Sequence, residues 1–222
     1  MKPCLTLVCT PIGNFKDLSE RGRQTIQSAS LVIGEEFTNT SKLLKKLDTP
    51  QDFELLNEHS TTEDIFKLVT KIKSNPLTCL FSDGGTPLLE DPGLELVREC
   101  IKEGIEIKVA PGASAFLIAL LLSGFSTSPF TFIGFLPRES GERIERMKRF
   151  LSLKHTLILY ETPYRYKKAF REILPLLKKE TRVFLGLNLT GEDEFIFRGN
   201  CGDLLKKLED LPKANPVLVL SN

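Results

Sequence analysis

Three glycine-containing loops hold the residue types most suited to chemistry in this sequence: residues 10–14, 82–87 and 111–114. Each follows an apolar run. In open α/β sheets, ligands bind beyond the carboxyl ends of the strands, and glycine lets the backbone approach them closely. None of the loops has the spacing of a GxGxxG dinucleotide fingerprint or of a Walker A phosphate loop. The pattern therefore indicates another kind of small-molecule pocket, with ordinary strand-to-helix turns as an equally weighted alternative.

The second loop, Ser82-Asp83-Gly84-Gly85-Thr86-Pro87, is the densest polar cluster. Its carboxylate, Asp83, suits a cationic or hydroxylated ligand, and Thr86 can donate a hydrogen bond. The alternative is an Asx-type turn in which Asp83 bonds its own loop. Metal ligands would have to cluster, but the five cysteines are dispersed and His59 lies far from His155. We therefore predict no metal site and reduced cysteines in a protein core.

The elements that position these loops alternate between apolar runs and helical periodicity. Ser19 is the expected N-cap of the first helix. In the first half the expected strands are residues 5–9, 31–33, 77–81 and 105–110, and the expected helices are 18–28, 41–47, 62–73 and 94–101. In the second half the expected helices are 113–122, 139–151, 167–177 and 201–208, and the expected strands are 130–134, 156–160, 182–187 and 217–220, with a further alternating segment at 194–197. Such alternation predicts parallel or mostly parallel sheets covered by helices on both faces.

The 222 residues suit one large α/β domain or two domains of about 110 residues each. The expected hinge lies near residues 111–114, with the loop at 124–129 as the alternative, and the first of these divides the chain into domains 1–111 and 112–222. The apolar stretch at 116–122 is too short to cross a bilayer, and the first residues do not resemble a signal peptide. These features predict a cytoplasmic protein that does not enter a membrane.

The overall charge does not indicate a nucleic-acid binder, because 30 Lys and Arg oppose 29 Asp and Glu. Any contact with RNA would have to come from a local patch. The two candidate clusters are Arg138, Arg143, Arg146, Lys148 and Arg149, and Arg165, Lys167, Lys168 and Arg171. We favour a solvated helix face paired with neighbouring glutamates for the first cluster, and phosphate contacts for the second.

Six motifs, in order over nearly the whole chain, resemble the ribosomal RNA small subunit methyltransferase I family. They are residues 10–15 with Asp17, Ser19 and Arg21; 82–88 with 91–93; 111–115 with 119–120, Ser123 and Gly124; 134–137; 160–165; and 198–199. The resemblance implies a tetrapyrrole methylase-like fold of two α/β domains with the cofactor cleft between them. It also implies a homodimer, and a cytidine 2′-hydroxyl in small ribosomal subunit RNA as the acceptor.

The same resemblance implies S-adenosylmethionine as the cofactor and supplies its expected contacts by position. The expected cofactor-binding residues are Pro11, on the substrate side, with Asp83, Gly85, Thr86, Ser114, Ala115, Tyr160, Leu187, Asn188 and Pro216.

Methyl transfer from a sulfonium gains much of its rate when donor and acceptor are held in line. A ribose hydroxyl is a poor nucleophile, so a general base or an oriented charge helps. The candidates are Glu35, Glu36, Glu161 and Arg165, of which we expect Glu36 and Arg165 to act. A structural role as a cap or an ion pair is the alternative for each.

Two segments depart from the family pattern. Residues 35–39, Glu35-Glu36-Phe37-Thr38-Asn39, replace a Glu-Asp-Thr-Arg stretch, and Asn39 stands in the place of the arginine. Residues 188–191 replace a Glu-Leu-Thr-Lys stretch with Asn188-Leu189-Thr190-Gly191. These changes affect the expected acceptor more than the cofactor. The alternatives are a tetrapyrrole or other small acceptor, and a member that binds the cofactor without catalysis.

Overall fold

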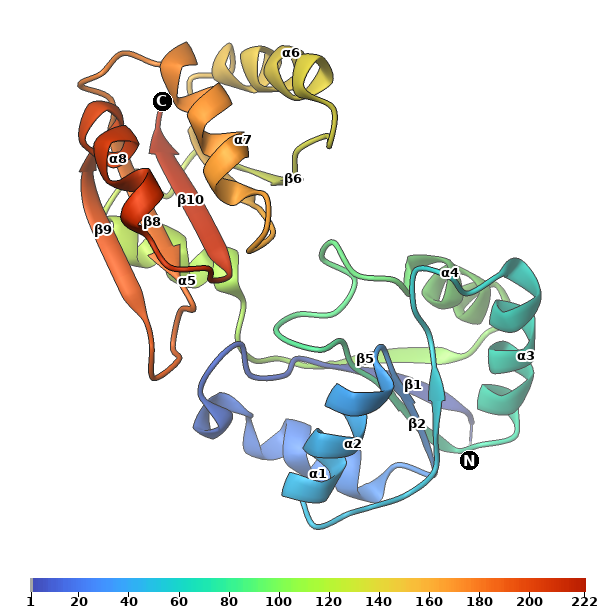
Figure 1. Ribbon diagram of the computed structural model, residues 1–222. Coiled ribbons are helices and arrows are strands. Elements are labelled where there is room, and N and C mark those ends of the chain that lie inside the picture. The colour runs from blue at the N-terminus through green and yellow to red at the C-terminus, as the bar shows by residue number, and fades with distance from the viewer. Residues whose placement is uncertain (1) are drawn as a thin grey trace. The chain divides into compact units, whose positions relative to one another are not determined.

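The computed structural model describes residues 2–222, which form two compact units divided between Ser114 and Ala115. Each unit contains one five-stranded sheet and its own helices (Figure 1).

The first unit is a parallel sheet with strand order β3-β2-β4-β1-β5. Its strands are β1 (Cys4–Val8), β2 (Leu31–Gly34), β3 (Phe53–Leu55), β4 (Leu77–Leu80) and β5 (Glu106–Ala110). Its helices are α1 (Glu20–Ser28), α2 (Phe37–Lys46), α3 (Thr62–Lys73) and α4 (Leu94–Lys102), with a 3₁₀ turn at Phe15–Asp17. The prediction of a parallel sheet is confirmed for this unit.

Alternate side chains of each strand enter two separate cores, because successive residues point to opposite faces of a sheet. Leu5 and Leu7 of β1 pack with residues of α3 and α4 on one face. Val8 and its neighbours on β2 and β4 pack with Ile26 of α1 and Leu44 of α2 on the other. The sheet is thus covered by helices on both faces.

Local capping fixes where two of these helices begin. The Ser19 side chain accepts a hydrogen bond from the Gly22 backbone N–H at 3.1 Å, which confirms Ser19 as the N-cap of α1. Thr61 and Asp64 form a reciprocal capping box at the start of α3. Helix α2 begins at Phe37, four residues before the predicted start, and its N-cap Glu36 makes no capping hydrogen bond with its side chain.

The second unit has strand order β6-β7-β10-β8-β9. Its strands are β6 (Phe130–Phe135), β7 (Thr156–Tyr160), β8 (Arg182–Leu187), β9 (Phe195–Asn200) and β10 (Pro216–Ser221). Its helices are α5 (Ala115–Ser123), α6 (Ser140–Leu151), α7 (Tyr166–Ile173) and α8 (Cys201–Lys207), with 3₁₀ turns at Leu174–Leu176 and Leu208–Asp210.

The prediction of a mostly parallel sheet is wrong for this second unit. Only β6 and β7 pair in parallel, whereas β10 pairs antiparallel with both β7 and β8, and β8 pairs antiparallel with β9. The β8–β9 hairpin reverses the chain direction. The helical crossovers through α7 and α8 still join strands of like direction, but each crosses one intervening antiparallel strand.

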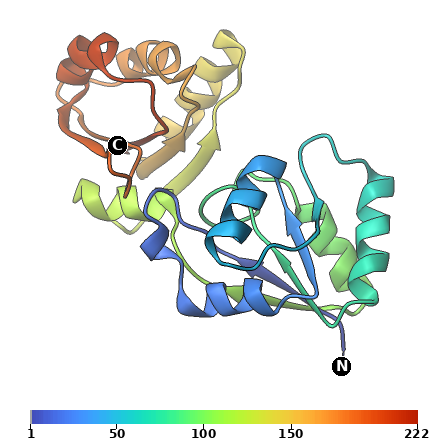
Figure 2. The ribbon, with the colours of Figure 1, turned by 60° about the horizontal axis from the view of Figure 1, so that its bottom comes forward.

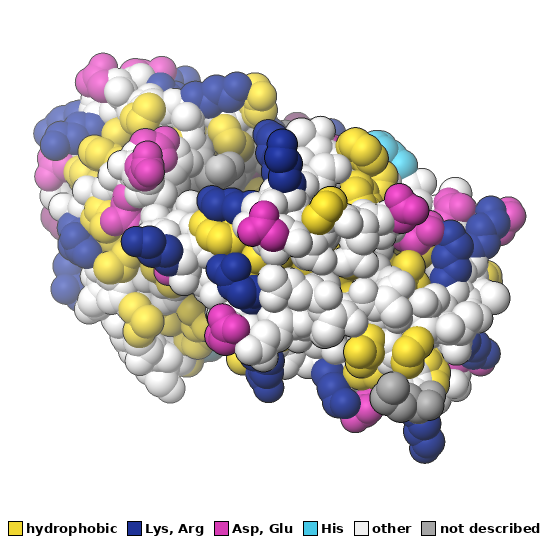
Figure 3. Space-filling view, turned by 90° about the horizontal axis from the view of Figure 1, so that it is seen from below, with side chains coloured by type: hydrophobic (Ala, Val, Ile, Leu, Met, Phe, Trp, Pro, Cys, Tyr) yellow, Lys and Arg dark blue, Asp and Glu magenta, His cyan; other side chains and the backbone are white. Residues whose placement is uncertain are grey.

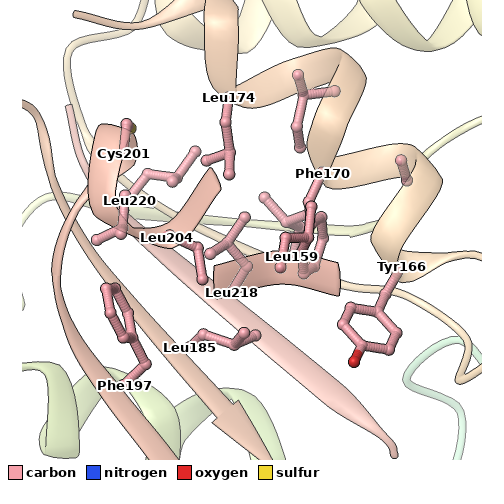
Figure 4. Close-up of a cluster of buried hydrophobic side chains, with 14 of the residues drawn as sticks. Leu159, Tyr166, Phe170, Leu174, Leu185, Phe197, Cys201, Leu204, Leu218 and Leu220 are labelled. Atoms are coloured by element: carbon pink, nitrogen blue, oxygen red, sulfur yellow. The ribbon is translucent and has the colours of Figure 1, made fainter. Parts of the chain in front are cut away.

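One face of this sheet packs against α6, α7 and α8, and the other packs against α5. Figure 4 shows the first core, in which Phe170, Leu174 and Leu204 from the helices meet Leu185 and Leu218 from the strands. Helix α5 contacts β7, β8 and β10. In Figure 2 it is the yellow-green helix on the side of the sheet away from the orange and red helices.

Across residues 2–222 no helix combines the length and the apolar character needed to span a bilayer.

Candidate functional site

The three glycine loops lie together at one edge of the first sheet. Strands β1, β4 and β5 are parallel neighbours, so their carboxyl ends meet at this edge. Thr10 and Gly85 exchange two backbone hydrogen bonds of 2.8 and 3.1 Å, which join the first loop to the second. The Thr86 hydroxyl donates to the Ala113 carbonyl at 3.0 Å and joins the second loop to the third. The loops form one connected surface.

Glycine is required where these loops pack most closely. Gly85 has φ +88° and is buried, and a β-carbon there would lie 3.1 Å from the Ile12 side chain. A β-carbon on Gly112 would lie 3.0 Å from the β-carbon of Cys9. Larger residues at either position would push the loops apart.

Several expected cofactor-binding residues lie on this surface. The exposed Asp83 accepts a 2.6 Å hydrogen bond from the side-chain amide of Asn39. Within the described part of the chain, the buried Ser114 hydroxyl oxygen has no hydrogen-bond partner. Buried polar groups are normally satisfied, so such an atom fits a place where a ligand supplies the partner.

Acidic side chains surround the Asp83 loop. Glu35, just after β2, accepts a hydrogen bond from the Asp83 backbone N–H at 3.2 Å. Burial, with the nearby charges of Asp91 and Asp83, raises the pKa of Glu35 to about 7. Burial, with the charges of Asp83 and Glu90, raises the pKa of Asp91 to about 6. The edge of the sheet therefore holds carboxyl groups that titrate close to neutral pH.

Replacing Glu35 by glutamine is expected to stabilise the protein at pH 8. The folded pKa of Glu35 lies above its unfolded value, so its contribution to stability is fully present in acid and is lost as the pH rises through about 7. Glutamine removes that loss of stability and can still accept the hydrogen bond from the Asp83 N–H. Allowing for the partial exposure of the site, the gain is about 1 kcal/mol at pH 8 and close to zero at pH 4.

Chemical denaturation of both proteins at the two pH values measures this difference. Glu36→Gln, at the exposed neighbouring position, is the matched control. An equal gain for Glu35→Gln at pH 4 and pH 8 would show that burial of the charge at Glu35 is not its origin.

A pocket of about 400 Å³ opens beside the Asp83 loop within the first unit. It lies between the loop after β1, helix α2 and the end of β4. Its lining residues are Thr10, Pro11, Gly13, Phe15, Asn39, Thr40, Lys42, Leu43, Lys46, Phe81, Ser82 and Asp83. The Lys46 ammonium lies 4.1 Å from the centre of the Phe15 ring. No sequence pattern indicates a shared site for Phe15, Lys42 and Lys46, because their juxtaposition depends on how α2 packs.

The expected cofactor-binding residues of the second unit also share one sheet edge. Tyr160 and Leu187 end β7 and β8, and β10 begins at Pro216, which pairs with Leu187. The Tyr160 hydroxyl accepts a 2.9 Å hydrogen bond from the Phe116 backbone N–H, beside Ala115 at the start of α5.

Asn188 lies at the same edge and holds the turn after β8. It has φ +47°, and its side-chain oxygen accepts a hydrogen bond from the Asn215 backbone N–H at 2.8 Å. Its side-chain amide donates to Asp193 at 2.6 Å. The Asn188 side chain therefore connects the chain segments that precede β9 and β10.

The two expected catalytic residues have different surroundings. Glu36 is exposed at the start of α2, in the first unit. Arg165, in the second unit, donates from Nε to Glu161 at 2.9 Å and from Nη2 to the Leu136 carbonyl at 3.2 Å. Glu161 is only 4% exposed, so this ion pair organises the connection between β7 and α7. The catalytic roles of Glu36 and Arg165 stay predictions.

The structure gives structural roles to several cations of the two basic clusters. Arg143 is buried and donates to Glu172 and to two backbone carbonyls, so its assignment to a solvated helix face is wrong. Lys148 pairs with Glu145, as expected for a solvated face. In the second cluster, Lys167 donates to the backbone carbonyl of Glu209, and Arg171 forms an ion pair with the Glu209 side chain. Figure 3 shows Lys and Arg interspersed with Asp and Glu on the visible face, without one continuous basic patch.

Comparison with known proteins identifies similar sequences along the whole chain. The family model described as Tetrapyrrole (Corrin/Porphyrin) Methylases matches residues 4–205. The chain is 47% identical to Ribosomal RNA small subunit methyltransferase I of Leptospira borgpetersenii, over 100% of this chain and 88% of the relative. It is 32% identical to the protein of that name from Thermotoga maritima, over 92% of this chain and 91% of the relative.

Solved structures with the same fold are far more distant in sequence. A diphthine synthase has a TM-score of 0.74 and 16% identity, covering 98% of this chain and 90% of the other. A cobalt precorrin-4 methyltransferase has a TM-score of 0.71 and 17% identity, covering 97% of this chain and 93% of the other. At this identity the likeness concerns the fold alone, and it confirms the predicted α/β class with two domains.

Proposed function

Since the chain belongs to the tetrapyrrole methylase family, and within it to the ribosomal RNA small subunit methyltransferase I family, we propose that it methylates a ribose 2′-hydroxyl of small-subunit ribosomal RNA. The protein is a methyltransferase. The observation that best supports the acceptor is the 47% identity along the full chain to a relative of that name.

S-adenosylmethionine is the proposed methyl donor, and the residues present fit it. The Asp83 carboxylate offers a counter-charge to a cationic ligand, the Gly85 loop permits close backbone approach, and the buried Ser114 hydroxyl lacks a partner among residues 2–222. Bound there, the cofactor supplies a sulfonium methyl group. Pro11 and Thr86 complete the proposed contacts of the first unit. Ala115, Tyr160, Leu187, Asn188 and Pro216 are those of the second.

The chain's own groups would prepare the acceptor. Glu36, exposed just beyond β2, is the proposed proton acceptor for the ribose hydroxyl. Arg165, fixed by Glu161, is proposed to hold an oriented positive charge at the start of α7. Most of the acceleration would come from holding the two reactants in contact and in line.

The cellular setting follows from the proposed acceptor. Ribosomal subunits lie in the cytoplasm, so we propose that this protein acts there. A homodimer is the proposed assembly, on the basis of the family resemblance.

The proposal is tested with two acceptors in parallel. The protein is incubated with methyl-labelled S-adenosylmethionine and either undermethylated small ribosomal subunits or a tetrapyrrole precursor. The proposal requires label in the subunits. Label in the macrocycle alone would instead support a small acceptor. Calorimetric binding of the cofactor without transfer to either would support a non-catalytic binder, and absence of binding would contradict the proposed donor.

A further inference from the structure

We propose that the pocket beside Asp83 is a subsite for one nucleotide of the acceptor RNA, with Lys42 and Lys46 holding a backbone phosphate and Phe15 contacting the base. This inference rests on the proposed function and adds to it a binding site for part of the RNA. The pocket's volume of about 400 Å³ falls within the range of small-ligand sites.

Lys42 and Lys46 are both exposed cations. They lie four residues apart on one face of α2, and both line the pocket. Within the part of the chain that the structure describes, neither forms an ion pair, in contrast to Lys148, Lys102 and Lys67, which pair with glutamates on their own helices. Ammonium groups of this kind are suited to contact a phosphate, because binding of the phosphate breaks no existing ion pair.

Phe15 gives the pocket an aromatic wall. Its ring is half-buried, with the Lys46 ammonium 4.1 Å and the Arg23 guanidinium carbon 5.5 Å from its centre. These cation–π contacts place positive charge next to an aromatic face. Proteins that bind single-stranded nucleic acid combine the same two elements, cations for the backbone and a ring for the base.

The pocket also adjoins the proposed donor site. Asp83 lines it and belongs to the loop proposed to contact the cofactor, and Pro11, proposed to lie on the substrate side, lines it as well. A nucleotide held here would lie next to the loop that holds the methyl donor. All of these residues belong to the first unit, so the juxtaposition depends on that unit alone.

The test replaces both lysines by glutamine and measures methyl transfer to undermethylated small ribosomal subunits. Lys45→Gln is the matched control, because Lys45 is exposed on the same helix but does not line the pocket. We expect KM for the subunits to rise about 10-fold in Lys42→Gln/Lys46→Gln, with kcat nearly unchanged and with the salt dependence of binding reduced by about one unit of slope. Circular dichroism and calorimetric affinity for S-adenosylmethionine should match those of the wild type. A KM equal to that of Lys45→Gln would overturn the subsite.

A second measurement separates this inference from the proposed function. If the wild-type protein labels no small subunit, the proposed function fails, and the pocket is then tested by NMR titration with cytidine 5′-monophosphate. Shifts confined to residues around Phe15 and α2, and lost in the double variant, would support a nucleotide site. Absence of such shifts at millimolar ligand would overturn it.

Discussion

Glu172→Ala is expected to destabilise the second unit by about 3–5 kcal/mol, because it leaves the buried Arg143 without its counter-ion. The Arg143 side chain is only 3% exposed, and its Nε donates to Glu172 at 3.0 Å. Its Nη2 also donates to Glu172, and its Nη1 donates to the Pro137 and Arg138 carbonyls at 2.7 and 2.9 Å, which fixes the loop before α6. The loss is measured as a lower midpoint for the denaturant transition of this unit.

The expected loss depends on pH. Burial alone would raise the pKa of Glu172, but the hydrogen bonds from Arg143 and Ser140 outweigh it and leave the pKa lowered. The pair therefore contributes stability above the unfolded pKa of the carboxyl, and this contribution is lost as the pH falls through the folded value. Glu172→Ala should then differ less from the wild type in acid.

Glu145→Ala is the control for this prediction. Glu145 pairs with Lys148 on the exposed side of α6, where solvent screens the ion pair, so its loss should leave the midpoint nearly unchanged. The double variant Arg143→Met/Glu172→Leu should recover part of the stability, because it leaves no unpaired buried charge although the Pro137 and Arg138 carbonyls lose their donor. Equal losses for Glu172→Ala and Glu145→Ala would contradict the account of Arg143 as a buried cation that requires its partner.

Asp83→Asn is expected to weaken binding of S-adenosylmethionine about 10-fold, equivalent to about 1.4 kcal/mol. The amide can still accept the hydrogen bond from Asn39, so the change removes the negative charge while the loop keeps its contact. A hydrogen bond to a charged group contributes about 1.5–3 kcal/mol. Because Asp83 is exposed, we expect the loss of binding free energy to lie at the low end of this range. Isothermal titration calorimetry measures the affinity directly.

Asp52→Asn provides the control, since Asp52 is an exposed aspartate between α2 and β3. It should bind the cofactor like the wild type. If Asp83→Asn does so too, Asp83 only shapes its loop, which is the alternative that its sequence context allowed.

Local sequence signals predict much of the fold. The apolar spacing of α3 gives its bounds, Thr62–Lys73, and the apolar runs of β7 and β8 give Thr156–Tyr160 and Arg182–Leu187. The glycine loops are also found, because residue type and position after a strand are both visible in the sequence. The three-residue strand β3 is missed, since so short a run has no periodicity.

Features that depend on distant residues could not be predicted. The direction of β10 depends on which strands it pairs with, and an apolar run fits a parallel or an antiparallel neighbour equally well. The many charges of α6 predict a solvated Arg143. Its burial depends on Glu172, which lies on α7 and is distant in sequence. Phe15 and Lys46 form one pocket wall only because α2 packs beside the loop after β1.

The identity of the methylated nucleoside tests the proposed ribose methylation most directly. Undermethylated small ribosomal subunits are incubated with the protein and methyl-labelled S-adenosylmethionine, and the RNA is digested to nucleosides and separated by chromatography. We predict that the label migrates as 2′-O-methylcytidine. Label in a base-methylated nucleoside would contradict ribose methylation. So would RNA that stays unlabelled although the protein binds the cofactor.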